Sequence, residues 1–239
     1  MPEPSVGVAI AVRDCERWLG ACIDSVLAQP ARVSAIAVVD DGSEDATASV
    51  AERYAPLVRL VRIRRSGVAV ARSRAFALLD TDVIVSIDAD DLLTAAGIEA
   101  RLAALRATPA LELVFGHERR FSELLDGAPV PVGEPRPAPL AGAMLVRRAA
   151  YEQVGGFDAG IAAEGLDWLL RARELGLAEH TVTEQVTWRR IHACNSAHAA
   201  QALSQFPRVL KTSLDRRRAA SGAAPLVPGA RHGRSQAGR

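Results

Sequence analysis

Residues 83–91, VIVSIDADD, place an apolar run directly in front of three carboxylates that fall within four residues. The run 83–87 is rich in valine and isoleucine, which is typical of a strand buried on both faces of a parallel sheet. Two carboxylates about 5 Å apart repel each other by roughly 3 kcal/mol at an effective dielectric constant near 20. The acids that follow this strand therefore need a nearby cation or full exposure to water.

The chain on the N-terminal side of this stretch alternates between strand and helix patterns. The sequence predicts strands at 6–12, 35–40, 57–63 and 83–87, and helices at 18–27, from about 46 to 54, and at 68–79. Such alternation is typical of an α/β fold, in which a mostly parallel, Rossmann-like sheet carries helices on both faces. We therefore predict this fold class for the first half of the chain.

The alternation becomes irregular after residue 107. We expect a strand at 111–116, a Pro/Gly-rich loop at 126–142, a short strand at 143–146, and a helix at 164–175. Residues 216–239 are basic and poor in large apolar side chains, so we predict a disordered tail there. Residues 1–215 are then expected to form a single domain with a mixed second half.

Composition restricts the classes of partner. The chain has 239 residues, 49% of them hydrophobic, and a formal net charge of +1, which gives no support for a nucleic-acid partner. Three cysteines without metal-ligand spacing suit a reducing compartment. No signal-peptide pattern and no apolar run of about 20 residues are visible. We therefore expect a cytoplasmic protein without a transmembrane segment, for which peripheral membrane contact remains open.

Six acidic residues cluster where predicted strands end. They are Asp14, Asp40, Asp41, Asp88, Asp90 and Asp91. Ligands of an open parallel sheet bind beyond the carboxyl ends of its strands, and Mg²⁺ and Mn²⁺ take carboxylate and phosphate oxygens. A divalent cation shared with a diphosphate would supply the compensating charge. The alternative is a helix-capping role, with Asp90 or Asp91 starting a helix near Thr94.

Several segments, taken in order, resemble the motif series of family 2 glycosyltransferases. They are VGVAIAVRDCERWLGACIDSVLAQ, VVDDGSEDAT, GVAVARSRA, DADDLL, GGFD and EGLDWLLRARELG. The resemblance covers about Val6 to Asn195. It implies a GT-A fold, a nucleotide-sugar donor and an inverting mechanism. It also implies a donor-binding half at about 5–107 and an acceptor half at 108–215.

The resemblance assigns roles to individual residues. It places the nucleotide-sugar donor against Val12, Asp14, Asp40, Arg72, Asp88, Ala89 and Arg190. It places the divalent cation, Mn²⁺ or Mg²⁺, against Asp90, Asp91 and His192. Chemically, an arginine fork suits a phosphate or the edge of a base.

The predicted catalytic base departs from the family pattern. Inverting transfer needs a carboxylate that takes the proton of the acceptor hydroxyl. The family uses the Asp of an "ED" pair, six residues before an Arg. Alignment on Arg171 puts Glu164 at the first position of the pair and Gly165 at the second. Three hypotheses remain: Glu164 is the base, Asp167 is the base, or the chain has lost catalysis and kept donor binding.

The sequence therefore predicts a metal-dependent inverting glycosyltransferase that uses a nucleotide-diphosphate sugar, with UDP-sugars the commonest donors in the family. The acceptor hydroxyl can belong to a glycan, a lipid-linked sugar, a peptide or a small metabolite. A sugar-phosphate nucleotidyltransferase is disfavoured because no Gly-rich loop follows the first strand. A dinucleotide oxidoreductase is disfavoured because GxGxxG is missing. A non-catalytic nucleotide-sugar-binding or scaffold protein stays open because of Gly165.

Overall fold

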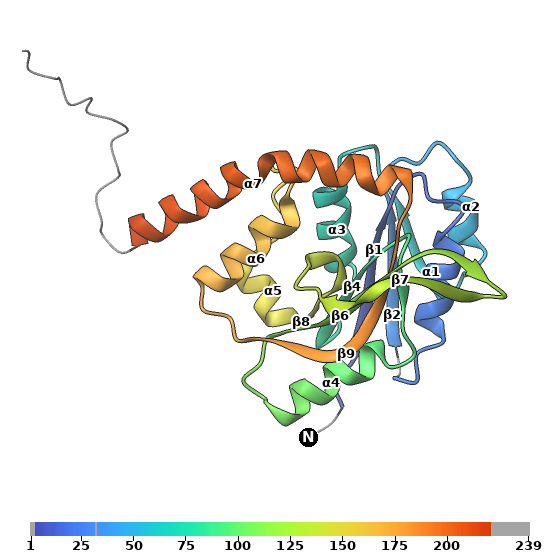
Figure 1. The fold of residues 1–239 in the computed structure, drawn as a ribbon, viewed down its shortest axis with the longest axis horizontal. Coiled ribbons are helices and arrows are strands. Elements are labelled where there is room, and N and C mark those ends of the chain that lie inside the picture. Colours follow the sequence, from blue (N-terminus) through green and yellow to red (C-terminus); the bar gives the residue numbers. More distant parts are fainter. Residues whose placement is uncertain (1–2, 32, 221–239) are drawn as a thin grey trace, which may run out of the picture.

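The computed structural model describes residues 3–31 and 33–220, and in this range a single nine-stranded sheet runs through the molecule (Figure 1). The strand order is β3-β2-β1-β4-β8-β6-β9-β5, and β7 pairs with β6 outside this path. The strands are β1 (Val6–Val12), β2 (Val33–Asp40), β3 (Arg59–Arg62), β4 (Val83–Asp88), β5 (Leu92–Leu93), β6 (Leu113–Leu125), β7 (Ala128–Pro137), β8 (Leu145–Arg147) and β9 (Glu179–Arg190).

Strand direction decides which loops meet. Strands β1 to β4 are mutually parallel where they pair, β8 is antiparallel to both β4 and β6, and β6 is parallel to β9. The strand β9 therefore points the same way as β1, β2 and β4. Its last residue, Arg190, reaches the edge at which Asp40 and Asp88 end their strands. This explains how residues a hundred positions apart share one site.

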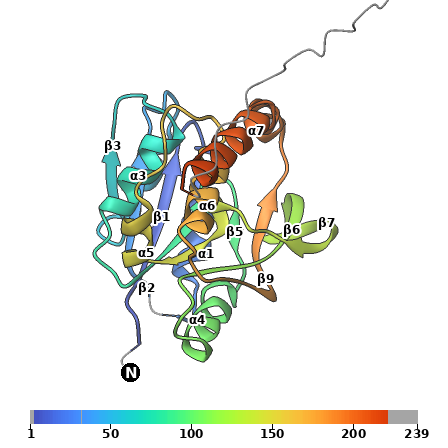
Figure 2. The same ribbon diagram turned by 90° about the vertical axis from the view of Figure 1, so that its left-hand side faces the viewer.

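Helices cover both faces of the sheet (Figures 1 and 2). They are α1 (Leu19–Leu27), α2 (Thr47–Glu52), α3 (Val68–Ala77), α4 (Gly97–Ala107), α5 (Arg148–Val154), α6 (Glu164–Glu174) and α7 (Ala193–Ala220), with a short 3₁₀ helix, η1 (Ala141–Ala143). The alternation of β1 separates the two cores. Val8 and Ile10 pack with α1, α2 and α4, whereas Ala9 packs with α3, α5 and α6.

The predicted α/β class is confirmed. In the second half of the chain, however, the sequence pattern did not predict all of the strands. The predicted loop at 126–142 contains a strand, β7, and β6 continues to Leu125, well beyond the predicted end at residue 116. Eight of the ten β7 residues are exposed, and among the described strands β7 pairs only with β6. Its prolines are tolerated because an edge strand leaves one row of backbone groups unpaired.

The C-terminal helix α7 spans 28 residues and crosses the top of the molecule in Figure 1. A disordered tail is predicted from Arg216 onward, whereas α7 continues to Ala220 in the structure. Arg216 ion-pairs with Glu174 (2.7 Å) and Asp167 (3.1 Å) of α6, which anchors this part of the chain. The remainder of the predicted tail, 221–239, lies outside the described residues. No helix within 3–31 and 33–220 combines the length and apolar character needed to cross a membrane.

Candidate active site

The carboxyl ends of β1, β2 and β4 bring the predicted donor-site acids to one edge of the sheet. Their register places Val12 beside Asp40, and Ala11 beside Asp88. Val12 is buried, and its carbonyl accepts a hydrogen bond from the backbone N–H of Asp41 (2.9 Å). The ends of the first two strands are therefore joined directly beneath the predicted site.

Arg72 of α3 lies between two carboxylates from distant parts of the chain. Its Nη2 donates to Asp88 Oδ1 (2.8 Å), and its Nη1 donates to Glu164 Oε1 at the first residue of α6. The side chains of Arg72 and Glu164 are only 9% and 10% exposed, whereas that of Asp88 is 46% exposed. Burial acts to lower the pKa of Arg72, but the two carboxylates raise it above its ordinary value. The guanidinium therefore stays charged and links the donor-side acid to the candidate base.

The loop after β2 is held by the two acids of the "DDGS" turn. Asp40 is fully buried, and its carboxylate accepts hydrogen bonds from the Ser43 N–H (2.9 Å) and from Arg62 Nε (2.9 Å). Asp41 accepts from the backbone N–H groups of Ser66 and Gly67, at 2.6 and 2.8 Å. The Arg62 side chain is 55% exposed. Asp40 therefore meets a nucleotide base only if Arg62 or Ser43 gives way.

Asp14, in the loop after β1, is hydrogen-bonded to the loop after β2. It adopts φ +49°, a left-handed conformation that Asp tolerates better than most residues. Its Oδ1 accepts from the Glu44 N–H (2.9 Å), and its own N–H donates to Ser43 Oγ (3.0 Å). The side chain is 43% exposed, so the other carboxylate oxygen, paired with Arg13 at 3.2 Å, faces solvent.

The acids after β4 separate into two environments. Asp90 Oδ2 lies 2.8 Å from His192 Nε2, and the imidazole stacks on Trp18 with the ring centroids 4.0 Å apart. Asp91 is buried and accepts from the Arg190 N–H (2.9 Å). Burial, followed by the charges of Asp90 and Asp88, raises the pKa of Asp91 well above its ordinary value. Asp91 therefore supports the backbone, whereas the side chains of Asp90 and His192 remain partly exposed, at 21% and 16%.

Arg190, a predicted donor ligand, is turned toward the protein. Its Nε donates to the Asp90 carbonyl (2.9 Å), and its guanidinium lies 4.3 Å from the ring centroid of Phe121. The residue is 5% exposed. These contacts hold the backbone of Asp90 in place, so the observed position of Arg190 is that of a supporting residue. Ala89, between Asp88 and Asp90, is also buried, at 6% exposure.

Asp90 and His192 fit a divalent cation that also binds phosphate. Neighbouring ligands of an octahedral ion with bond lengths of about 2.1 Å stand about 3 Å apart, close to the 2.8 Å between these two groups. Among the residues that the structure describes, no group of three His, Cys, Asp or Glu side chains could hold a metal ion. Phosphate oxygens and water would have to complete the shell, which is common for Mg²⁺.

The N-terminal turn of α6 contains both candidate bases. Glu164 contacts Arg72, whereas Asp167 is 1% exposed and has both carboxylate oxygens engaged. These accept from Arg171 Nε (2.8 Å) and from Arg216 Nη1 (3.1 Å). The structure thus places Glu164 with Arg72 and Asp88, two predicted donor-site residues, and Asp167 at the contact between α6 and α7.

The helix η1 packs closely against Asp88 and against the start of α6. A Cβ atom at Gly142 would lie 2.5 Å from Asp88 Oδ2, and one at Gly165 would lie 3.0 Å from Ala141 Cβ. The close contact with η1 leaves little room for an aspartate at position 165. Fully buried Arg101 of α4 donates to the Ala143 carbonyl (2.9 Å) and so fixes the end of η1.

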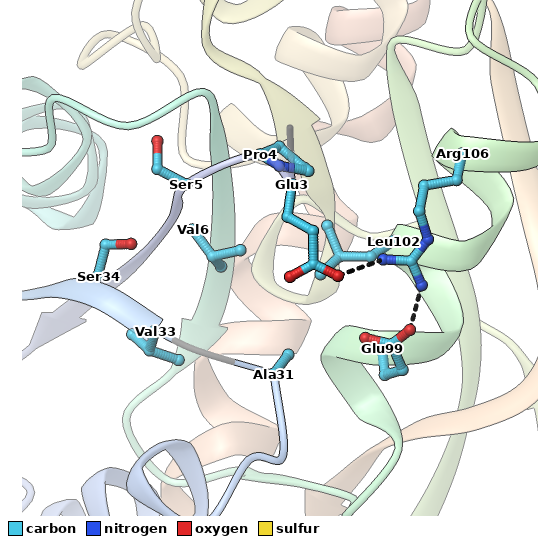
Figure 3. A pocket seen from close by; sticks show the side chains of 10 residues that line it. All are labelled: Glu3, Pro4, Ser5, Val6, Ala31, Val33, Ser34, Glu99, Leu102 and Arg106. Atoms are coloured by element: carbon cyan, nitrogen blue, oxygen red, sulfur yellow. Dashed lines mark hydrogen bonds and ion pairs between the residues drawn. The ribbon is translucent and has the colours of Figure 1, made fainter. Parts of the chain in front are cut away.

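A separate hollow of about 410 Å³ opens at the opposite edge, where β1 and β2 begin (Figure 3). Arg106, the one basic residue among the described residues that line it, lies between Glu99 and Glu3. None of the predicted site residues lines this hollow, so it plays no part in the candidate active site.

Sequence reasoning missed several residues that build the site: Trp18, Arg62, Arg101 and Gly142. Asp41 was noted as a strand-end acid, but its role in ordering the turn before α3 depends on the tertiary structure. Trp18 and Arg62 carry no motif of their own. The sequence around Gly142 gives no sign of its close approach to Asp88, because this approach follows from the packing of η1 on β4.

Comparison with known proteins identifies the family. Residues 7–132 match the model of "Glycosyl transferase family 2", and the chain belongs to this family. EpsH and EpsE of Bacillus subtilis (strain 168) both carry glycosyltransferase names. EpsH is 30% identical over 114 residues, 43% of this chain and 33% of EpsH. EpsE is 25% identical over 197 residues, 76% of this chain and 71% of EpsE. The chain thus spans about a third of EpsH and most of EpsE.

The crystal structure of S. aureus TarS (residues 1–349) shares the fold. It superimposes with a TM-score of 0.66 at 14% identity, over 78% of this chain and 60% of TarS. A complex of the same TarS fragment with UDP-GlcNAc gives 0.65 at 15% identity, over 79% and 59%. These matches confirm the predicted GT-A fold. The family assignment confirms the predicted class, a glycosyltransferase domain.

Proposed function

We propose that the chain is a metal-dependent inverting glycosyltransferase that moves a sugar from a nucleotide-diphosphate sugar to an acceptor hydroxyl. The observation that carries the proposal is the bridge made by Arg72, which joins Asp88 at the end of β4 to Glu164 at the start of α6. A UDP-sugar is the proposed donor, since the TarS structures include complexes with UDP and UDP-GlcNAc.

In this proposal the donor lies along the carboxyl edge of the sheet. Asp40 and Asp14 flank the nucleoside, and the half-exposed carboxylate of Asp88 faces the ribose. Asp90 and His192 would hold the Mn²⁺ or Mg²⁺, which when bound neutralises charge on the diphosphate leaving group. Arg72 supplies a further positive charge at the same edge.

Glu164 is the proposed base. Its carboxylate takes the proton of the acceptor hydroxyl while that oxygen forms a bond to the anomeric carbon. The bond from this carbon to the diphosphate oxygen breaks on the opposite side, which inverts the configuration. Arg72 Nη1 donates a hydrogen bond to Glu164 Oε1, so this contact has to loosen before the carboxylate can take the proton. The donor diphosphate, as a competing anion, would draw Arg72 away from Glu164.

The decisive experiment combines donor binding with turnover. Calorimetric titration with UDP, GDP and TDP, with Mn²⁺ and then with EDTA, measures base preference and metal dependence. Release of UDP from UDP-GlcNAc, with water as acceptor, measures turnover when the acceptor is unknown. We expect Glu164→Gln to lower turnover about 100-fold or more and to retain UDP binding, with Asp167→Asn as the matched control. Full turnover by Glu164→Gln together with its loss in Asp167→Asn would refute the assignment.

The second candidate is a nucleotide-sugar-binding protein without catalysis. It is favoured by Gly165 at the usual base position and by the ion pair that occupies Glu164. Metal-dependent UDP binding together with turnover no faster than that of Glu164→Gln would support it. Absence of binding to every nucleotide, in folded protein, would contradict both candidates.

A further inference from the structure

Three leucines of α7 are exposed on one face of this helix. Leu203, Leu210 and Leu214 have 58%, 48% and 50% of their surface in contact with solvent. Separations of seven and four residues place them along one stripe. Val209 and Ser213, which are 1% and 3% exposed, lie on the neighbouring face that packs toward α6. The leucine stripe is therefore left uncovered after α7 has made its contacts with the domain.

Basic side chains flank the leucine stripe. Lys211 follows Leu210 directly, and Arg217 and Arg218 lie one turn beyond Leu214. Residues 203–239 contain eight Arg and Lys residues and a single acidic residue, Asp215, although the whole chain has a net charge of only +1. Positive charge is thus concentrated in α7 and in the sequence that follows it.

The helix also lies next to the candidate active site. It begins at Ala193, directly after His192, and crosses the end of the molecule at which β9 stops (Figures 1 and 2). Arg216 joins it to Asp167 and Glu174 of α6, three and ten residues after Glu164. A surface that binds α7 would therefore lie beside the edge of the sheet where the acceptor is expected to enter.

We propose that α7 docks on an anionic lipid surface through the leucine stripe and its basic flanks. A narrow apolar stripe with Lys and Arg beside it is typical of helices that lie in the membrane interface, where anionic headgroups attract the basic side chains. A second copy of the chain fits less well. A stable dimer buries about 1,200 Å² or more, and three half-exposed leucines supply only a small part of that area.

The test uses the full chain and vesicles made of equal parts of phosphatidylglycerol and phosphatidylcholine. We expect the protein to co-sediment with these vesicles, to bind vesicles of pure phosphatidylcholine much more weakly, and to be released by added salt. The variant Leu210→Gln/Leu214→Gln should bind about tenfold more weakly, because it removes buried apolar area. Leu57→Gln is the matched control, since Leu57 is 62% exposed and lies outside α7.

Circular dichroism and thermal unfolding of the three proteins should coincide, because the substituted side chains are exposed. Equal loss of vesicle binding in Leu57→Gln would overturn the proposal, as would wild-type protein that remains in the supernatant. Light scattering that shows a wild-type dimer and a monomeric double variant would also overturn it, in favour of self-association. The measurement requires no turnover, so its outcome is independent of the proposed transferase activity.

Discussion

The guanidinium of Arg72 contacts Asp88 with one nitrogen, at 2.8 Å, and Glu164 with another. The two acids are 76 residues apart in the sequence and come from the two halves of the domain. Asp88 ends the central strand β4, and Glu164 begins α6. One buried cation thus sets the relative position of the donor-side acid and the proposed base, and this relationship leads to the first prediction.

Replacement of Arg72 by Gln should weaken UDP binding about 10- to 100-fold, because hydrogen bonds to charged groups contribute about 1.5–3 kcal/mol. It also leaves Asp88 and Glu164 without their shared cation, so the melting temperature should fall. Calorimetric titration with UDP and Mn²⁺ checks the affinity. Arg74→Gln is the control, because Arg74 is exposed on the same helix. Equal affinities in the two variants would show that Arg72 does not reach the nucleotide.

A methyl group at Gly142 should disturb the proposed donor site without replacing any charged residue. The Cβ of Gly142→Ala would lie 2.5 Å from Asp88 Oδ2, so either the carboxylate or η1 has to move. We expect UDP affinity to fall about tenfold, equivalent to about 1.4 kcal/mol. Leu140→Ala, two residues earlier and 40% exposed, should leave the affinity unchanged. Unaltered binding in Gly142→Ala would mean that Asp88 does not contact the donor.

The first half of the fold could be predicted because its signals are local. Val6–Val12 and Val83–Asp88 are short, nearly continuous apolar runs, and the polar turns between elements are clear. Strand β7 could not be predicted, because its four prolines indicate a loop and only pairing with β6 makes them tolerable. Helix α7 contains Pro207 and few large apolar residues, so its stability depends on contacts with α6 that have no local signature.

In the candidate site, too, some features have local sequence signals and others depend on tertiary packing. The acids at the strand ends could be predicted, because parallel strands bring their carboxyl ends together. The pairing of Arg72 with Glu164 spans 92 residues and depends on where α6 packs. From the sequence, Asp167 is also a candidate for the base. Only the positions of Arg171 and Arg216 show that both of its oxygens are engaged.

Asp167 should matter for stability more than for turnover. Asp167→Asn weakens two ion pairs of a carboxylate that is 2% exposed, so we expect a loss of about 1–3 kcal/mol in the free energy of unfolding. Urea denaturation measures this loss. Glu152→Gln, which removes an exposed pair with Arg148 at 3.4 Å, should cost no more than about 0.5 kcal/mol. A stable Asp167→Asn protein that has lost UDP release would instead identify Asp167 as catalytic.

The contact between α6 and α7 should weaken in acid. Burial acts to raise the pKa of Glu174, but hydrogen bonds from Arg216 and Ser213 lower it below its ordinary value of 4.5. A carboxyl whose folded pKa is depressed stabilises the fold above its unfolded pKa, and this stabilisation disappears as the pH falls through the folded pKa. The free energy of unfolding of the wild type should therefore exceed that of Glu174→Gln by about 1–2 kcal/mol at neutral pH. This difference should shrink below about pH 4.5. Urea denaturation of both proteins across this range measures the difference, and a gap that does not change with pH would contradict the ion-pair explanation.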